Sequence, residues 1–532
     1  MKWLISEWYA FNERRSNDYV TDLPLPAEKN NNGMEKTIEQ KEYTLDPSNW
    51  DELRDLGHRM VDDMFEYLST VRDRKVWQPF GNEHKIALDQ PLPMKGTPTA
   101  EVYEDFKEHV LPFTLGNIHP RFWGWVVGTG SPTGMLADML ISAMNASPSF
   151  GEHATMYVEK QVLDWTKEIY GFPKSSSGLL TTGASMANIL ALTVARNSFR
   201  SNIRKEGIQA MEGKLTMYAS VETHSCQQKA AELLGIGSDQ LRKIPVDDDY
   251  QIRLDLLEEK IKEDKANGFI PFCIVGNAGT VNTGAIDDLD ALAAIAKREG
   301  LWFHIDGAFG AVPNILPGYR NRLNGLEKAD SLTFDFHKWF YVNYEVGGLL
   351  IKDPKLHKEA LSINAHYLAH HPRGIIAGDI NYNHLGIELS RNAKAIKVWM
   401  ILKEQGIEKY RKLVAQNLRQ AQFLADLVNK EIKLQLLAPV PMNIVCFRYT
   451  KPGLSDEELN EINKEILMQL HEQGIAVPSF TILKGRYALR AAITNHRSRK
   501  EDFELLVKEV VRLGDQISKK TLNGHVHGAD AH

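Results

Sequence analysis

The stretch SLTFDFHKWFYVNYEVGG, residues 331–348, places His337 and Lys338 between two strongly apolar segments. The segment before them, SLTFDF, predicts a buried β-strand, because short apolar runs are typical of strands inside a sheet. Open α/β sheets bind their ligands beyond the carboxyl ends of their strands. The stretch therefore indicates a sheet with a reactive amine at its ligand-binding edge.

The segments before this stretch show the same order of strand, turn and helix. It occurs in GLLTTGASMANILALTVARNSF (178–199), KLTMYASVETHSCQQKAAELLG (214–235) and the region from FIPFCIVGN (269–277), and LWFHIDGAFGAV (301–312) adds a strand. This alternation predicts an α/β fold with a mostly parallel central sheet covered by helices. After about residue 400, helical patterns alternate with short strands such as NIVCFRYT and YALRAAIT, which predicts a smaller α+β domain.

The chain has 532 residues, which is too long for one simple core, so we expect several domains. The apolar spacing in DPSNWDELRDLGHRMVDDMFEYLSTV predicts a long amphipathic helix, with Asp46, Ser48 or Asn49 available to cap it. The regions we expect are a polar extension (1–44), a helical N-terminal domain (45–130), a large α/β domain (131–400), a small α+β domain (401–517) and a disordered tail (518–532).

The composition points to small-molecule chemistry. The chain has 63 Lys+Arg against 69 Asp+Glu, so its net charge of -6 gives no electrostatic case for a nucleic acid or an anionic membrane as a partner. No apolar run approaches the ~18 residues that span a bilayer. Its three cysteines are far apart in sequence, which favours a reducing compartment, and we expect a cytoplasmic protein without a bound metal.

Residues with reactive or ligand-binding groups follow each strand-like segment. They are Gly183, Ala184 and Ser185, then His224, Thr280, Asp306 with Ala308, and finally His337 with Lys338. Each alone has an ordinary explanation, such as a tight turn, a hydrogen-bonded loop histidine or a lysine that reaches solvent. Together they meet the needs of pyridoxal phosphate, which requires a lysine for a Schiff base, an acid at its pyridine nitrogen and an anion site for its phosphate.

Each of these roles has its own physical reason. Phe336, Trp339 and Phe340 flank Lys338, so we expect desolvation to lower the pKa of its amine. Asp306 follows an apolar strand and would keep a pyridine nitrogen protonated. A histidine ring at His224 would stack on one face of the cofactor, and the small Ala308 would lie against the other.

These segments resemble the pyridoxal-phosphate-dependent group II amino-acid decarboxylases, in the aromatic-L-amino-acid and tryptophan decarboxylase branch. The matching motifs are Ser331–Leu332 through His337–Lys338–Trp339, HIDGAFG (304–310), LNGLEKADS (323–331) and HPRFWGW (119–125). The resemblance runs from about residue 45 to about 515 and implies the type I fold of pyridoxal-phosphate enzymes, which is the aspartate-aminotransferase fold.

The resemblance also implies roles for individual residues. Lys338 would hold the cofactor, and Asp306 and His224 would contact its ring. Gly183, Ala184, Ser185 and His337 would serve the phosphate, with Thr280 and Ala308 as further contacts. Tyr367, in a segment similar to the family's mobile loop (363–379), would protonate the substrate α-carbon. The family forms homodimers with active sites at the interface.

This chain departs from the family's usual pattern at two positions. Asp335 stands where the animal aromatic enzymes have asparagine, and Val281 follows Thr280 where a second threonine is usual.

The expected substrate is an aromatic L-amino acid, which would be converted to its amine. The positions that match the family's pocket are Trp125, Val126 and Gly128, with Phe150 nearby, and their apolar character suits an aromatic ring better than a carboxylate. The alternatives are a decarboxylase of an acidic amino acid, an aldehyde-forming relative and a catalytically silent scaffold. Tyr367 favours the amine, because aldehyde-forming relatives tend to carry phenylalanine there.

Overall fold

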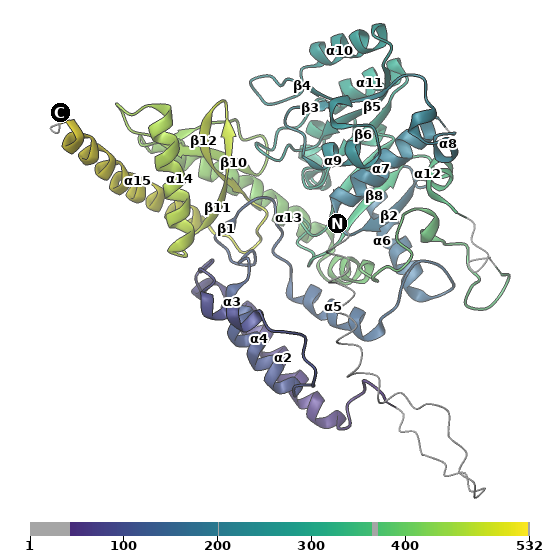
Figure 1. Ribbon diagram of the computed structural model, residues 1–532, viewed down its shortest axis with the longest axis horizontal. Coiled ribbons are helices and arrows are strands. Elements are labelled where there is room, and N and C mark those ends of the chain that lie inside the picture. The colour runs from purple at the N-terminus through teal and green to yellow at the C-terminus, as the bar shows by residue number, and fades with distance from the viewer. Residues whose placement is uncertain (1–42, 201, 364–370, 530–532) are drawn as a thin grey trace, which may run out of the picture. The chain divides into compact units, whose positions relative to one another are not determined.

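The computed structural model describes residues 43–200, 202–363 and 371–529 (Figure 1). Tyr367, for which a catalytic role was predicted, lies outside these residues, as does nearly all of the polar extension expected at 1–44. The domain boundaries expected at residues 130 and 400 remain predictions.

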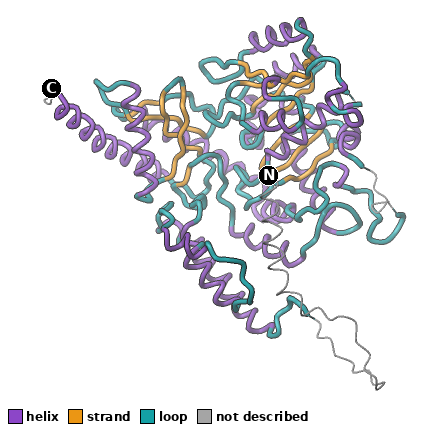
Figure 2. The backbone as a smooth tube through the Cα atoms, in the orientation of Figure 1, coloured by secondary structure: helices purple, strands orange, loops and turns teal. Residues whose placement is uncertain are grey.

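A seven-stranded sheet forms the centre of the large α/β region. Strands are drawn in orange in Figure 2. Its strand order is β2-β8-β7-β6-β5-β3-β4, and all the pairings are parallel except the two made by β8, which confirms a mostly parallel sheet. The strands are β2 (Ser177–Thr181), β3 (Leu215–Ser220), β4 (Leu241–Ile244), β5 (Ile270–Asn277), β6 (Trp302–Asp306), β7 (Ser331–Asp335) and β8 (Gly347–Ile351).

Helices cover both faces of this sheet, and the alternation of side chains along each strand explains why (Figure 1). In β3, Met217 and Ala219 belong to the core shared with α7 (Ala184–Phe199) and α9 (Cys226–Leu233). Tyr218, between them, belongs to the core shared with α10 (Leu254–Ala266) and α11 (Leu289–Glu299). The strands are therefore apolar on both sides, as their sequences indicated.

A second sheet of five strands forms the C-terminal region, in the order β1-β11-β12-β10-β9. The short strand β1 (Phe122–Trp123) lies in the HPRFWGW motif and pairs in parallel with β11, so this early segment becomes an edge of the late sheet. The other strands are β9 (Leu434–Leu436), β10 (Ile444–Tyr449), β11 (Val477–Leu483) and β12 (Arg486–Ala492). Helices α13 (Ala395–Lys430), α14 (Asp456–Glu472) and α15 (Lys500–Ala529) supply much of its core.

The long helix expected from residue 46 onward is α2 (Trp50–Ser69). Asn49 caps it, since its Oδ1 accepts hydrogen bonds from the backbone N–H groups of Asp51 (3.1 Å) and Glu52 (3.3 Å). The remaining helices are α3 (Asn82–Leu88), α4 (Thr99–His109), α5 (Pro132–Met144), α6 (Ala154–Tyr170), α8 (Ile203–Glu206) and α12 (Pro354–Leu361). Over the described residues, no helix combines the length and apolarity needed to cross a membrane.

The C-terminal tail differs from the sequence prediction. Disorder was expected from Ser518 onward, but α15 continues to Ala529. A helix that is already formed extends at one hydrogen bond per residue without a new nucleus, so a polar segment without proline can prolong it.

Buried His357 on α12 joins two distant segments. Its Nδ1 accepts a hydrogen bond from the Ser177 hydroxyl (2.6 Å), and its Nε2–H donates to the carbonyl oxygen of Leu385 (2.9 Å). Burial lowers the pKa of His357 from 6.5 to about 4, so the folded protein holds this ring neutral.

We predict that His357→Gln weakens the pH dependence of the free energy of unfolding between pH 4 and 6.5. In that window the unfolded chain binds a proton at residue 357 that the folded chain does not, so His357 makes stability fall as pH falls from 6.5 towards 4. Removing that proton should reduce the slope by up to about 1.4 kcal/mol per pH unit. Urea unfolding of the wild type and the variant at pH 5 and pH 7 gives the change in the free energy of unfolding with pH. An equal change in the two proteins would contradict the prediction.

Candidate active site

A cavity of about 580 Å³ lies beyond the carboxyl ends of the parallel strands. Its volume is within the range of small-molecule sites. The predicted site residues that line it are Trp125, Val126, Gly183, Ala184, Ser185, His224, Asp306, Ala308, His337 and Lys338. Residues from four segments of the large region and from HPRFWGWVV thus meet at one place, which makes this cavity the candidate active site.

Of the predicted residues within the described ranges, three are not in the lining. Thr280 is buried in the turn after β5, where its hydroxyl lies 3.1 Å from that of Thr283 and accepts a hydrogen bond from the Ala285 N–H. Gly128 lies directly behind the lysine segment, since a Cβ there would be 2.1 Å from the carbonyl oxygen of His337. Phe150 instead forms an isolated β-bridge with Asn381.

Lys338 forms an ion pair that the sequence analysis did not predict. Its Nζ lies 2.8 Å from Oδ2 of Asp335, the last residue of β7. Burial is the largest single influence on the pKa of Lys338, and it lowers that pKa. The nearby carboxylates of Asp335 and Asp306 together outweigh burial, so the pKa lies above its ordinary value of 10.5. The expectation of a lowered pKa was therefore wrong, because it counted the aromatic neighbours and left out the carboxylate three residues earlier.

The imidazole of His337 is oriented by the backbone. Its Nδ1 accepts a hydrogen bond from the Val346 N–H (3.1 Å), so a neutral ring carries its hydrogen on Nε2. Burial lowers the pKa of His337, which favours this neutral form. Its ring centroid lies 4.5 Å from that of Tyr344, which also lines the cavity.

The amino end of α7 provides an anion site beside His337. Gly183 precedes the helix, and the first N–H groups of a helix have no partner within it. The hydroxyl of Ser185 adds a further donor at the same edge of the cavity. A Cβ on Gly347 of β8 would lie 2.5 Å from the Cα of Gly183 and from Oδ1 of Asp335, so only glycine lets the three segments approach this closely.

Asp306, at the end of β6, is held through both carboxylate oxygens. Its Oδ1 accepts a hydrogen bond from the Ala308 N–H (3.2 Å). Its Oδ2 accepts hydrogen bonds from the side-chain amides of Asn188 (3.1 Å) and Gln227 (3.2 Å). Neither amide could be recognised from the sequence, because each lies inside a helix in no recognised motif and meets Asp306 only in the folded chain.

His224 is also neutral and fixed. Its Nδ1 accepts a hydrogen bond from the Cys226 N–H (3.2 Å), and burial lowers its pKa although Asp306 acts in the opposite direction. The buried thiol of Cys226 lies 3.9 Å from Asp306 Oδ2, and burial raises its pKa. A neutral imidazole in this position offers a flat ring face rather than a charge.

Arg490 on β12 is a second group that the sequence analysis missed. Its guanidinium donates hydrogen bonds to the carbonyl oxygens of Trp125 (2.8 Å), Asn282 (3.0 Å) and Val281. Burial lowers its pKa to about 10, and all its hydrogen-bond partners in the described part of the chain are uncharged. The C-terminal sheet thereby fixes Trp125 and Val281, two residues of the cavity wall.

The residues present fit pyridoxal phosphate. Lys338 supplies the amine, Asp306 the carboxylate and His224 a neutral flat ring, all in the lining of one cavity. The amino end of α7, with the Nε2–H of His337, supplies donors for a phosphate. Gly347 lets β8 pack against Gly183, which places the amino end of α7 at this edge of the cavity.

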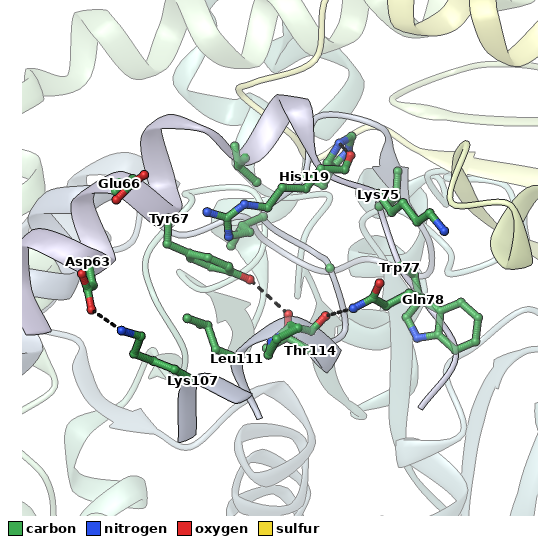
Figure 3. A pocket seen from close by; sticks show the side chains of 16 residues that line it. Asp63, Glu66, Tyr67, Lys75, Trp77, Gln78, Lys107, Leu111, Thr114 and His119 are labelled. Atoms are coloured by element: carbon green, nitrogen blue, oxygen red, sulfur yellow. Dashed lines mark hydrogen bonds and ion pairs between the residues drawn. The ribbon is translucent and has the colours of Figure 1, made fainter. Parts of the chain in front are cut away.

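A larger hollow of about 650 Å³ lacks such a set of groups (Figure 3). Its Lys107 and Asp63 form an ion pair (3.3 Å), and the Tyr67 hydroxyl lies 3.4 Å from that of Thr114. Burial lowers the pKa of His119 to about 4, so this ring is neutral. None of the predicted site residues within the described ranges lines it, which leaves the cavity at the sheet edge as the candidate.

Comparisons with known proteins found similar proteins over most of the chain. A family model described as the pyridoxal-dependent decarboxylase conserved domain matches residues 82–450. The aromatic-L-amino-acid decarboxylase of Bacillus atrophaeus is 30% identical over 472 residues, covering 88% of this chain and 96% of that protein. The phenylacetaldehyde synthase of Arabidopsis thaliana is also 30% identical, over 487 residues, covering 87% of this chain and 97% of that protein.

Among solved structures, that of Oryza sativa TDC with PLP and tryptamine has a TM-score of 0.83 at 24% sequence identity. The likeness covers 89% of this chain and 100% of that chain. It confirms the predicted fold class.

We predict that Asp335→Asn lowers the pKa of Lys338. The substitution removes the carboxylate that raises this pKa and leaves the burial that lowers it. The rate at which the protein takes up pyridoxal phosphate, followed by absorbance across a pH series, reports the deprotonated amine, and its midpoint should move to lower pH.

Asp330→Asn is the matched control, because this partly buried carboxylate precedes the other end of β7 and accepts a hydrogen bond from the Phe303 N–H (2.8 Å). A midpoint that stays in place or rises in Asp335→Asn would show that the ion pair does not govern Lys338.

Proposed function

We propose that this chain, which belongs to the pyridoxal-dependent decarboxylase family, decarboxylates an aromatic L-amino acid to its amine and releases carbon dioxide. Membership of the family makes it a carboxy-lyase whose cofactor is pyridoxal phosphate. The relatives named as aromatic-amino-acid decarboxylases support the aromatic substrate. The observation that carries the proposal is the character of the cavity wall.

Part of the cavity wall is apolar. Trp125, Val126 and Phe309 line it, and Trp125 is 54% exposed, so its indole is available to a ligand. Among the described lining residues, Lys338 is the only lysine and there is no arginine. An acidic substrate side chain would leave its carboxylate facing apolar groups, which is costly, whereas an aromatic ring buries favourably there.

Each residue of the site has a task that its surroundings suit. Bound pyridoxal phosphate supplies an electron sink for the electron pair left when the substrate carboxylate departs. Lys338 would hold the cofactor and then carry a proton on its amine, which Asp335 stabilises at 2.8 Å. Asp306, with both oxygens accepting hydrogen bonds, would keep a positive charge on the ring nitrogen. His224, neutral and fixed by the Cys226 N–H, would cover the ring face and exclude water.

The amine is the proposed product, rather than an aldehyde. Relatives of both kinds are about equally similar to this chain, so overall similarity does not separate them. Tyr367 supports the amine, because the resemblance assigns that position the proton transfer to the substrate α-carbon. Tyr367 lies outside the described residues.

We further propose that the protein acts as a homodimer. Beyond the resemblance, α5 supports this, since it exposes Met139 (51%), Leu140 (43%) and Met144 (51%), and exposed apolar groups that cluster mark interaction surfaces. We expect sedimentation equilibrium to give a mass near twice 60.2 kDa, and a mass equal to one chain would contradict the proposal.

A cytoplasmic location is proposed on the state of the cysteines. Cys226, Cys273 and Cys446 are all buried and free of disulfides, as is usual for proteins of a reducing compartment.

We predict that the protein loaded with pyridoxal phosphate releases carbon dioxide from at least one of tryptophan, tyrosine, phenylalanine and dihydroxyphenylalanine. Its kcat/KM for that substrate should exceed the value for glutamate or aspartate by about 100-fold or more, because an unpaired carboxylate in the apolar wall is strongly disfavoured. Lys338→Ala is the control and should lose turnover. Preference for an acidic amino acid would refute the aromatic assignment.

We predict that Tyr367→Phe diverts product from the amine to the aldehyde, because the phenol that returns a proton to the α-carbon is absent. Quantifying both products from one incubation gives the ratio. Amine output equal to that of the wild type would remove Tyr367 from this role.

A further inference from the structure

We propose that Asn188, Gln227 and His304 are positioning residues that hold Asp306 ionised and oriented towards the cofactor, through a hydrogen-bond chain that runs in one direction into its carboxylate. The proposal rests on the proposed function, because the ring nitrogen that Asp306 would face belongs to pyridoxal phosphate. The chain starts at Trp302 and passes through Ser331, His304 and Asn188.

The contacts are short and buried. The Trp302 Nε1–H donates to the Ser331 hydroxyl oxygen (2.8 Å), which lies 2.8 Å from Nδ1 of His304. Nε2 of His304 lies 2.6 Å from Oδ1 of Asn188, whose amide Nδ2 donates to Asp306 Oδ2 (3.1 Å). The side chains of Asn188, His304 and Ser331 are fully buried, so water does not compete for these groups.

The carboxylate sets the direction of every bond. An ionised carboxylate only accepts, so the amide nitrogen of Asn188 must face Asp306 and its oxygen must face His304. An amide oxygen also only accepts, so His304 must donate from Nε2. A neutral imidazole has one N–H, which leaves Nδ1 to accept the hydrogen of Ser331, whose oxygen in turn accepts from Trp302.

Gln227 fits the same orientation. Its Nε2 donates both to Asn188 Oδ1 (3.0 Å) and to Asp306 Oδ2 (3.2 Å), so both of these atoms are acceptors. If Asp306 were protonated, the Asn188 amide could turn over, and His304 would then accept at Nε2 and carry its hydrogen on Nδ1. A hydrogen on Nδ1 of His304 would therefore mean that Asp306 is not an ionised acceptor of the Asn188 amide, since that arrangement requires the hydrogen on Nε2.

The surroundings of His304 keep it neutral. Burial lowers its pKa to about 4, although the charge of Asp306 raises it. Asn188, Ser331 and Asp306 are the groups that face it from α7, β7 and its own strand. A neutral His304 accepts from Ser331 at Nδ1 and donates to Asn188 from Nε2, and it adds no charge beside the carboxylate of Asp306.

The first test measures the affinity for pyridoxal phosphate of Asn188→Ala against Asn197→Ala. Asn197 is a matched control, because it is buried on the same helix and donates one hydrogen bond, to the Ala360 carbonyl (3.0 Å), away from Asp306. Loss of a buried donor to a charged group should weaken binding about tenfold or more in Asn188→Ala, whereas Asn197→Ala should bind within about twofold of the wild type.

The pH profile separates this role from a merely structural one. A carboxylate that has lost a donor takes up a proton more readily, so the affinity of Asn188→Ala should begin to fall at a higher pH than that of the wild type. Equal affinities and equal pH profiles in the two variants would overturn the proposal. A wild type that does not bind pyridoxal phosphate would instead refute the proposed function.

The second test needs no variant of Asn188 and so is independent of how that variant folds. Nitrogen NMR of protein labelled with ¹⁵N-histidine, with the His304 signal assigned by its loss in His304→Gln, shows which ring nitrogen carries the hydrogen. We expect it on Nε2 in both the cofactor-free and the loaded protein. A hydrogen on Nδ1 would reverse the direction of the hydrogen bonds between Ser331, His304 and Asn188 and would overturn the proposal.

Discussion

The parallel alignment of β5, β6 and β7 is the constraint on which the rest of the site depends. Its hydrogen-bonded register pairs Asn277 with Asp306, the last residues of β5 and β6, and Asp306 with Thr333, beyond which β7 continues to Asp335 at the same edge. A one-residue slip would turn Asp306 to the other face of the sheet, because successive side chains alternate. Lys338 lies at the same edge of the sheet, three residues after the end of β7. The amine of Lys338 and the carboxylate of Asp306 therefore line one cavity.

Buried charges in this site have fixed partners within the chain. Lys338 has the carboxylate of Asp335, Asp306 has two amides and a backbone N–H, and Arg490 has three carbonyl groups. Leaving any of these groups unpaired would cost several kcal/mol by typical values. The same partners decide protonation, so His224 and His337 are neutral while the lysine between the two carboxylates is favoured in its charged form.

Several features could be predicted because they depend on neighbours along the chain. The strand before Lys338 and the strand before Asp306 were evident from their apolar runs, and Asn49 was a recognisable helix cap. Features that depend on distant segments were missed. These include the amides on Asp306 and the parallel strand β1 in the C-terminal sheet. The raised pKa of Lys338 was missed although its main cause, Asp335, lies only three residues earlier.

The sequence by itself determined the class of fold, the strands that precede the site residues, and most of the reactive residues at the ends of those strands. Periodicity and turn chemistry are local, so they can be found without coordinates. Only the tertiary structure decided which of those residues share a cavity, what charge each one carries and which uncharged side chains orient them. Those properties depend on burial and on distances between residues far apart in sequence, such as Asn188 with Asp306 and Arg490 with Trp125, and no local pattern encodes them.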